Sequence, residues 1–128
     1  MNILLDSHAL VWLADEDPRL PQRVISIMHH DEHSLFLSVA TYWELEIKRQ
    51  TRRIESRDSV SDLLAQLVID LSLTFLPILP SHVRAYGNLP LHHRDPFDRM
   101  LIAQAQSERM PILTADPRFR PYNIETIW

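Results

Sequence analysis

Four acidic residues stand at points where the chain is expected to leave a strand or to enter a helix. Asp6 and Asp116 each directly follow a short apolar run, and Glu44 and Asp98 fall in the first turns of two helical patterns. Carboxylates that meet in one crevice repel each other strongly unless a cation lies between them. Oxygen ligands in a chain without cysteine match Mg²⁺ or Mn²⁺ rather than Zn²⁺. These ions activate water and stabilise charge in phosphoryl transfer, so the four acids predict that type of chemistry.

The same positions also suit helix capping, which needs no active site. Thr41 and Glu44 have the spacing of a capping box, in which two side chains satisfy backbone N–H groups of the first turn. Asp95 and Asp98 have the positions of the cap and of the third residue in a helix that starts at Pro96. Taken one at a time, the acids are better explained as caps. An acid at all four junctions favours a shared site, and position alone leaves both interpretations open.

Short apolar runs alternate with longer segments of helical periodicity along the chain. The apolar runs predict strands over residues 3–5, 34–39, 74–78, 111–114 and 123–128. The helical periodicity predicts helices over residues 7–13, 19–30, 41–53, 60–71, 81–87 and 96–108, with connections over 54–59 and 87–95. This alternation indicates an α/β fold with a mostly parallel sheet covered on both faces. The carboxyl ends of its strands share one edge, where residues distant in sequence converge.

The composition limits the alternatives. The 128 residues suit one domain over residues 1–128. The single glycine, Gly87, argues against a phosphate-binding P-loop and a dinucleotide-binding domain, because both need several glycines. The net charge of −4 argues against binding nucleic acid by charge alone, although bound divalent cations reverse the local sign. The absence of cysteine, of a basic leader and of a long apolar run favours a cytoplasmic protein without a membrane segment.

Two groups of histidines leave both a functional and an ordinary interpretation open. His29, His30 and His33 surround the expected end of a helix, where they either bind a metal or are simply solvated. His92 and His93 precede the acidic cap position and either contact substrate or belong to an ordinary connection. We favour solvation for the first group and leave the second undecided.

Five segments, in chain order, resemble motifs of the PIN-domain family, and in particular of its VapC-type toxins. The segments read DSHALVW from residue 6, SVATYWEL from residue 38, HRDPFDRMLIAQA from residue 93, LTAD from residue 113 and IW at residue 127. The third segment is the most specific match. Ser7 stands where threonine is more usual in the family, and it keeps the hydroxyl group. The resemblance covers the whole chain and agrees with the strand–helix junctions identified above.

The resemblance implies a PIN-like three-layer sandwich in which helices flank a central, mostly parallel sheet. It implies a Mg²⁺- or Mn²⁺-dependent endoribonuclease that hydrolyses RNA phosphodiester bonds with metal-activated water. The residues that it assigns as catalytic and metal-binding are Asp6, Glu44, Asp98 and Asp116. Asp95 and Thr114 are possible accessory residues. It also implies the toxin of a type II toxin–antitoxin pair, neutralised by a cognate antitoxin protein and commonly a homodimer.

Three other readings of the acidic residues remain as alternatives. A Mg²⁺-binding phosphoryl-receiver domain usually needs an acidic pair after the first strand and a lysine near the last, but the only lysine, Lys48, lies mid-chain. A phosphatase of the haloacid dehalogenase type needs a second aspartate two residues after Asp6, where His8 stands. A non-catalytic PIN-like binding module would be expected to lose some of the acids, and all four are present.

Overall fold

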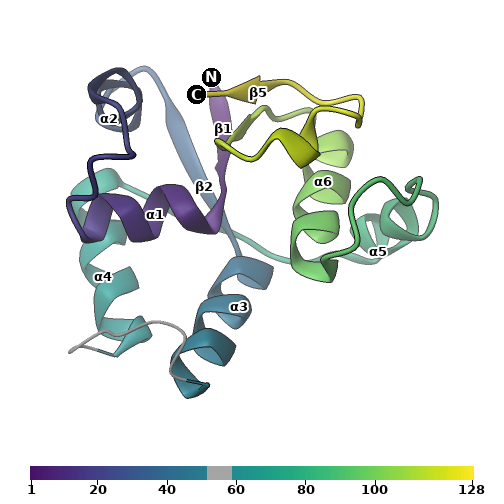
Figure 1. Cartoon of the computed structure of the whole chain (residues 1–128), viewed down its shortest axis with the longest axis horizontal. Helices are drawn as coiled ribbons and strands as arrows, with labels where there is room; N and C mark the ends of the chain where they lie inside the picture. The colour runs from purple at the N-terminus through teal and green to yellow at the C-terminus, as the bar shows by residue number, and fades with distance from the viewer. Residues whose placement is uncertain (52–58) are drawn as a thin grey trace.

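A computed structural model describes residues 1–51 and 59–128, which form a central parallel sheet between layers of helices (Figure 1). The strands are β1 (Asn2–Leu5), β2 (Ser34–Ser38), β3 (Thr74–Leu76), β4 (Ile112–Leu113) and β5 (Thr126–Ile127). Their order across the five-stranded sheet is β3-β2-β1-β4-β5, and every pair is parallel. The predicted α/β class and mostly parallel sheet are therefore confirmed.

The helices in the described residues lie close to the predicted segments. They are α1 (Ser7–Ala14), α2 (Gln22–Met28), α3 (Val39–Gln50), α4 (Val60–Leu71), α5 (Pro80–Gly87) and α6 (Pro96–Glu108), followed by a 3₁₀ turn, η1 (Pro117–Phe119). The bounds of α6 match the prediction at both ends. The predicted helix end at residue 53 and most of the predicted connection over 54–59 lie outside the described residues.

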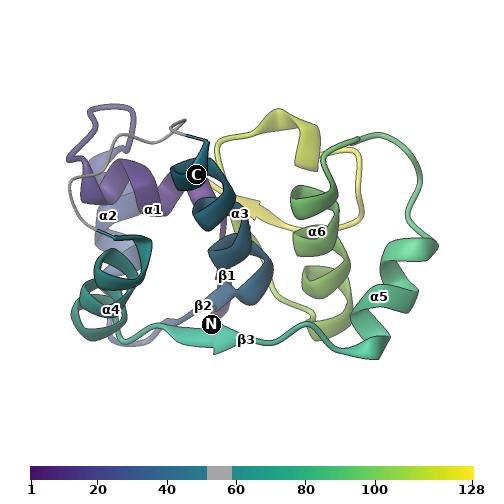
Figure 2. The same ribbon diagram turned by 90° about the horizontal axis from the view of Figure 1, so that it is seen from below.

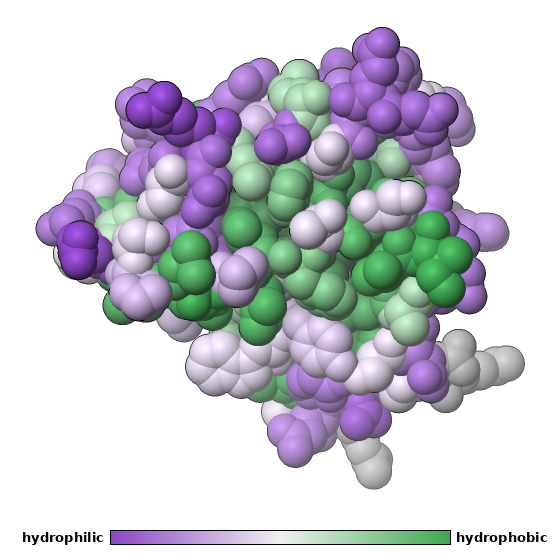
Figure 3. All heavy atoms as spheres, turned by 180° about the vertical axis from the view of Figure 1, so that it is seen from behind, coloured by the Kyte–Doolittle hydropathy of each residue, from purple (hydrophilic) through white to green (hydrophobic). Residues whose placement is uncertain are grey.

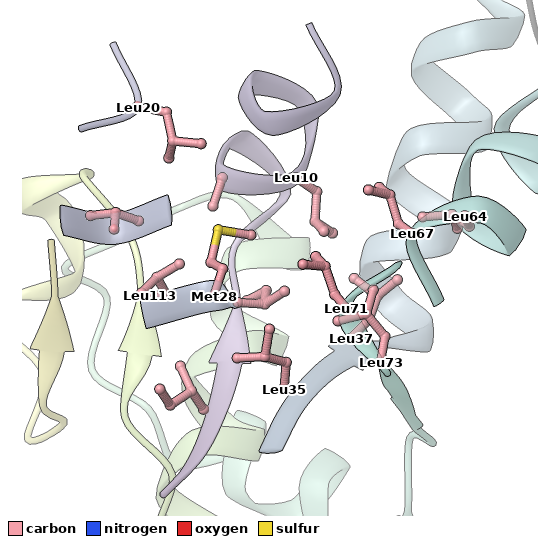
Figure 4. Packing of buried hydrophobic residues seen from close by; sticks show 14 of the residues in the cluster. Leu10, Leu20, Met28, Leu35, Leu37, Leu64, Leu67, Leu71, Leu73 and Leu113 are labelled. Carbon is pink, nitrogen blue, oxygen red and sulfur yellow. The ribbon is translucent and has the colours of Figure 1, made fainter. Parts of the chain in front are cut away.

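Alternation along the central strand divides the core into two layers. Ile3 and Leu5 of β1 pack on the face covered by α1, α2 and α4, whereas Leu4 packs on the face covered by α6. Figure 4 shows the first of these layers, in which Leu10 and Met28 approach the sheet from two helices. Because both faces of the sheet are covered, the fold is the three-layer sandwich that the sequence predicted.

Several element ends differ from the prediction, and four of them have a clear local reason. Ser38 caps α3 by accepting a hydrogen bond from the backbone N–H of Ala40, so the helix begins at Val39 and β2 ends one residue early. The predicted capping box at Thr41 and Glu44 is therefore wrong, since both residues lie inside the helix. Strand β3 ends before Pro77, because proline lacks the N–H group that pairing with the next strand needs. Helix α2 begins after Pro21, because proline suits the start of a helix.

The edge of the sheet at β3 adjoins a largely apolar surface. Figure 2 shows β3 at one side of the molecule with α3 between α4 and α6, and Figure 3 shows apolar side chains over the centre of the face opposite to that of Figure 1. Trp43 is 59% exposed and Val83 is 55% exposed. No helix in residues 1–51 and 59–128 combines the length and apolar character needed to cross a membrane.

Candidate metal centre

The carboxylate of Asp6 is held at the end of β1 by a residue from the far end of the chain. Thr114, which follows β4, donates a hydrogen bond of 2.8 Å from its hydroxyl to Asp6 Oδ2. Asp6 occupies the cap position of α1, but its side chain accepts no hydrogen bond from a backbone N–H of that helix, so it does not act as a cap. Hydrogen bonding to Asp6 raises the pKa of His8, whose Nδ1 lies 3.7 Å from Asp6 Oδ2.

Glu44 enters the same region from the second turn of α3. Because Ser38 caps the helix, Glu44 is not needed at its N-terminus and its side chain is free for other contacts. Glu44 is only 6% exposed, and its Oε2 lies 3.6 Å from the ammonium of Lys48, one turn further along the helix. The carboxylate of Glu44 is buried and has one cationic neighbour, the ammonium of Lys48, so it could also serve as a ligand of a metal ion.

Asp95 and Asp98 have different roles: Asp95 caps helix α6, whereas Asp98 belongs to the acidic cluster. Asp95 caps α6, since its Oδ1 accepts hydrogen bonds from the backbone N–H groups of Phe97 and Asp98. Asp98 lies in the first turn of α6 with its side chain 13% exposed, and its Oδ2 is 3.0 Å from Nε2 of His93. Asp95 therefore stabilises the start of the helix that carries Asp98.

Asp98 is the electrostatic centre of the group. Burial raises its pKa most, and the negative charges of Asp6, Asp95, Glu44 and Asp116 raise it further, to about 8. The four acids at the strand–helix junctions thus act on one another across the carboxyl edge of the sheet. Without a cation the last proton stays on Asp98 at neutral pH, which indicates a concentration of negative charge beyond what the protein itself neutralises.

Asp116 is neutralised by a neighbour in the chain. Arg118 makes a bidentate contact, in which Nε donates to Asp116 Oδ1 at 3.1 Å and Nη2 to Asp116 Oδ2 at 2.8 Å, and its backbone N–H also donates to Asp116 Oδ1. Burial alone would raise the pKa of Asp116, but the hydrogen bonds from Arg118 outweigh it and hold the pKa below its usual value. Asp116 also caps η1, so the capping interpretation is correct for this residue as well.

His93 lies inside the cluster rather than in a solvated connection. It is 2% exposed, and its ring packs edge-on against Phe119, with centroids 5.7 Å apart. Its Nε2 lies 3.8 Å from Asp116 Oδ2 in addition to its contact with Asp98. His92, the adjacent residue, is exposed and packs against Tyr122.

A hydrogen-bonded network holds the segment that carries His93. The hydroxyl of Tyr122 accepts a hydrogen bond from the backbone N–H of His93 and donates one to the carbonyl of Pro90, both 2.8 Å long. The guanidinium of Arg99, only 6% exposed, donates to the carbonyls of Pro90 and His93. These contacts satisfy the backbone of an irregular connection and so give His93 a defined position.

The described residues contain two groups able to offer three ligand atoms within 4.8 Å of one another. One group is His93, Asp98 and Asp116, and the other is Glu44, Asp95 and Asp98. Asp98 belongs to both. The donors are mainly carboxylate oxygens, and the acids crowded around Asp98 favour a bound cation, so the residues fit a hard divalent ion such as Mg²⁺ or Mn²⁺.

Sequence reasoning placed the acids at one edge of the sheet, and the structure has them there. It left the role of His93 undecided and did not single out Arg118, since neither residue type at its position distinguishes a buried contact from an exposed one. A signal for His93 was its place two residues before the helix cap. Of the predicted histidine group, His29 and His30 are exposed and His33 is partly buried, and none of the three belongs to either of the two ligand groups found among the described residues.

Comparison with known protein families gives a match over most of the chain. The family model described as "PIN domain" matches residues 3–124. The chain belongs to the PIN domain family. A search of curated proteins found no match for this PIN domain.

Solved structures share the fold of this PIN domain at low sequence identity. VapBC2 from Rickettsia felis, bound to a promoter DNA fragment, superposes with a TM-score of 0.77 at 13% identity, covering 99% of this chain and 98% of that one. VapBC-1 from nontypeable Haemophilus influenzae gives 0.70 at 15% identity, with coverage of 99% and 97%. FitAcB from Neisseria gonorrhoeae gives 0.68 at 17% identity, with coverage of 98% and 96%.

Proposed function

We propose that this chain, a single PIN domain over residues 1–128, is a Mg²⁺- or Mn²⁺-dependent endoribonuclease. The observation that carries the proposal is the junction of carboxylates around Asp98, whose pKa rises to about 8 through burial and the charges of its acidic neighbours. Membership of the PIN domain family adds the nuclease chemistry. The catalytic and metal-binding residues in this proposal are Asp6, Glu44, Asp98 and Asp116, with Asp95 and Thr114 in support.

Each of these residues has a role that follows from its contacts. Asp98, which belongs to both ligand groups, would hold a divalent cation, and Asp116 would join it once Arg118 turns away. Asp6, whose charge acts on Asp98, would bind the cation directly or through water. A cation at this position supplies activation of water and stabilisation of the charge on the scissile phosphate. Glu44, buried beside Lys48, orients the attacking water. Thr114 holds Asp6 through its hydroxyl, and Asp95 holds the helix start beneath Asp98.

The experiment for this proposal is cleavage of RNA by the purified chain. Mg²⁺ or Mn²⁺ should support cleavage and EDTA should stop it, whereas cleavage that continues undiminished in EDTA would exclude the mechanism. Asp98→Asn should lower the rate by orders of magnitude. Asp62→Asn is the matched control, because Asp62 is exposed and holds the same third position of helix α4 that Asp98 holds in α6.

The biological role that we propose is that of a VapC-type toxin in the cytoplasm, paired with an antitoxin protein. The support is the likeness in fold to the VapBC and FitAcB structures together with the five sequence segments. Expression should arrest growth, and co-expression of the small protein from the adjacent gene should restore it. If expression of the wild-type chain is as harmless as expression of Asp6→Asn, the toxin assignment fails.

We also propose a homodimer, because apolar side chains of α3 and α5 are exposed around an apolar pocket. This pocket has a volume of about 290 Å³ and is bordered by Trp43, Val83 and Phe97. Trp43 packs edge-on against Phe97 while leaving most of its own ring exposed. Exposed apolar patches of this type mark protein interfaces.

A further inference from the structure

The hydrogen bonds of His93 determine which of its ring nitrogens carries the proton. The backbone N–H of Asp95 donates a 3.1 Å hydrogen bond to Nδ1 of His93. A backbone N–H can only donate, so Nδ1 uses its lone pair and carries no hydrogen. In neutral imidazole the single proton is then on Nε2. A nitrogen that carries a proton has no free lone pair for a metal ion.

The protonated nitrogen, Nε2, points into the acidic cluster and makes no hydrogen bond there. Nε2 of His93 is buried, and it lies 3.0 Å from Asp98 Oδ2 and 3.8 Å from Asp116 Oδ2. The contact with Asp116 is too long for a hydrogen bond and the contact with Asp98 lacks the geometry of one, so Nε2 has no hydrogen-bond partner. A small rotation of the Asp98 carboxylate would complete the hydrogen bond from Nε2. A metal ion bound to the other oxygen of Asp98 would favour such a rotation.

We propose that His93 is a positioning residue and not a metal ligand: its Nε2–H donates to the carboxylate of Asp98 and orients it for the metal. This inference rests on the proposed metal-dependent function. His93 would otherwise be counted as a nitrogen ligand, because it forms one of the two three-ligand groups. With His93 as a donor, the ligand atoms from this chain are all oxygens. Such a set suits hard cations and gives no imidazole to Zn²⁺.

The surroundings of His93 suit a positioning role. Tyr122 and Arg99 hold its backbone, Phe119 packs on its ring, and Asp95 sets its tautomer. The residue that sets the tautomer is also the cap of α6, the helix that carries Asp98. Asp95 therefore helps to place both the donor, His93, and the carboxylate that it orients, Asp98. Residues that orient a ligand in this way typically change metal affinity by about 10- to 100-fold when they are replaced.

The first experiment is a direct measurement of the tautomer by ¹⁵N NMR on the full wild-type chain. His93 should show a proton on Nε2 and none on Nδ1, both without metal and after saturation with Mg²⁺. A proton on Nδ1, or loss of the Nε2 proton when Mg²⁺ binds, would overturn the proposal. This measurement needs no variant, so it decides the matter even if substitutions impair folding.

The second experiment compares Mg²⁺ affinity by calorimetry in two variants of this residue. His93→Gln keeps an N–H donor near the position of Nε2 and should bind Mg²⁺ within about threefold of wild type. His93→Phe keeps the packing against Phe119 but removes the donor, and its affinity should fall about 10-fold or more. His92→Gln is the matched control, because His92 is exposed and contacts no carboxylate among the described residues.

The outcomes separate this inference from the proposed function. If His93→Gln and His93→Phe lose Mg²⁺ affinity equally, the imidazole itself is required and the positioning role is wrong; if neither loses affinity, it is also wrong. If the wild-type chain binds Mg²⁺ with the expected tautomer but cuts no RNA, the nuclease proposal fails and the role of His93 stands. If the wild-type chain binds neither Mg²⁺ nor Mn²⁺, both are overturned.

Discussion

Replacement of Asp98 by asparagine should make the metal-free protein more stable at neutral pH. The pKa of Asp98 is raised above its usual value by burial and by the neighbouring carboxylates. An acid whose pKa is raised on folding destabilises the native state as the pH increases, because the unfolded chain ionises first. The destabilisation is absent at acid pH, grows between the two pKa values and is complete above the folded one. Asparagine has the size of the protonated acid and avoids this cost.

The size of the effect follows from the two pKa values of Asp98. Its ordinary pKa of 3.8 rises to about 8 in the folded chain. Each pH unit between these values adds about 1.4 kcal/mol, which gives an upper limit on the order of 4 kcal/mol at pH 7. Near pH 4 the advantage of Asp98→Asn should shrink below about 1 kcal/mol. Asp62→Asn, at the same position of another helix, should instead cost about 0.3–1 kcal/mol through the helix dipole.

Urea unfolding of wild type, Asp98→Asn and Asp62→Asn between pH 4 and pH 8.5, in EDTA and in Mg²⁺, tests this prediction. Wild type should gain more stability from Mg²⁺ than Asp98→Asn does, because a ligand stabilises the state that binds it. Suppose that metal-free Asp98→Asn is less stable than wild type at pH 7 and responds to Mg²⁺ as wild type does. Asp98 would then be a helix cap like Asp62, and the electrostatic reasoning would be refuted.

Three further predictions concern the surroundings of the acidic cluster. Arg118→Gln should raise the pKa of Asp116, because it removes the side-chain hydrogen bonds that lower it; an unchanged ¹³C NMR titration of the Asp116 carboxyl would contradict this. Tyr122→Phe should cost about 1–3 kcal/mol in urea unfolding, because it leaves the buried backbone N–H of His93 without an acceptor; an unaltered midpoint would count against the network. Trp43→Ser should reduce the dimer fraction in sedimentation equilibrium, and a wild-type chain that stays monomeric at high concentration would rule out the dimer.

The order and type of the elements could be predicted because their signals are local. The continuous apolar run of β1 and the helical spacing of α6 are properties of the segments themselves, and both segments were predicted nearly to the residue. Element ends depend on which side chain supplies a cap. Thr41 was the predicted cap of α3, but Ser38, three residues earlier, accepts the backbone N–H of Ala40 instead.

The strand topology predicts which acids lie at one edge of the sheet, but not which contacts their side chains make. Parallel strands place Asp6 and Asp116 at one edge whatever their side chains do. Whether Asp6 caps a helix or joins a cluster depends on Thr114, which lies 108 residues away in the chain. The burial of His93 likewise depends on Phe119 and Tyr122, which follow the last helix. Capping and catalysis were offered as alternatives, but Asp116 caps a turn and belongs to the cluster as well.

The hydrogen bond between Asp6 and Thr114 has a consequence for how the chain is made. Asp6 is synthesised 108 residues before its partner. The nascent chain can build β1, β2 and β3 as neighbours, but β4 must then add to the free side of β1 before the acidic cluster exists. A nascent chain that ends before Thr114 therefore carries an incomplete acidic cluster. The topology of the sheet separates the synthesis of Asp6 from the completion of the cluster.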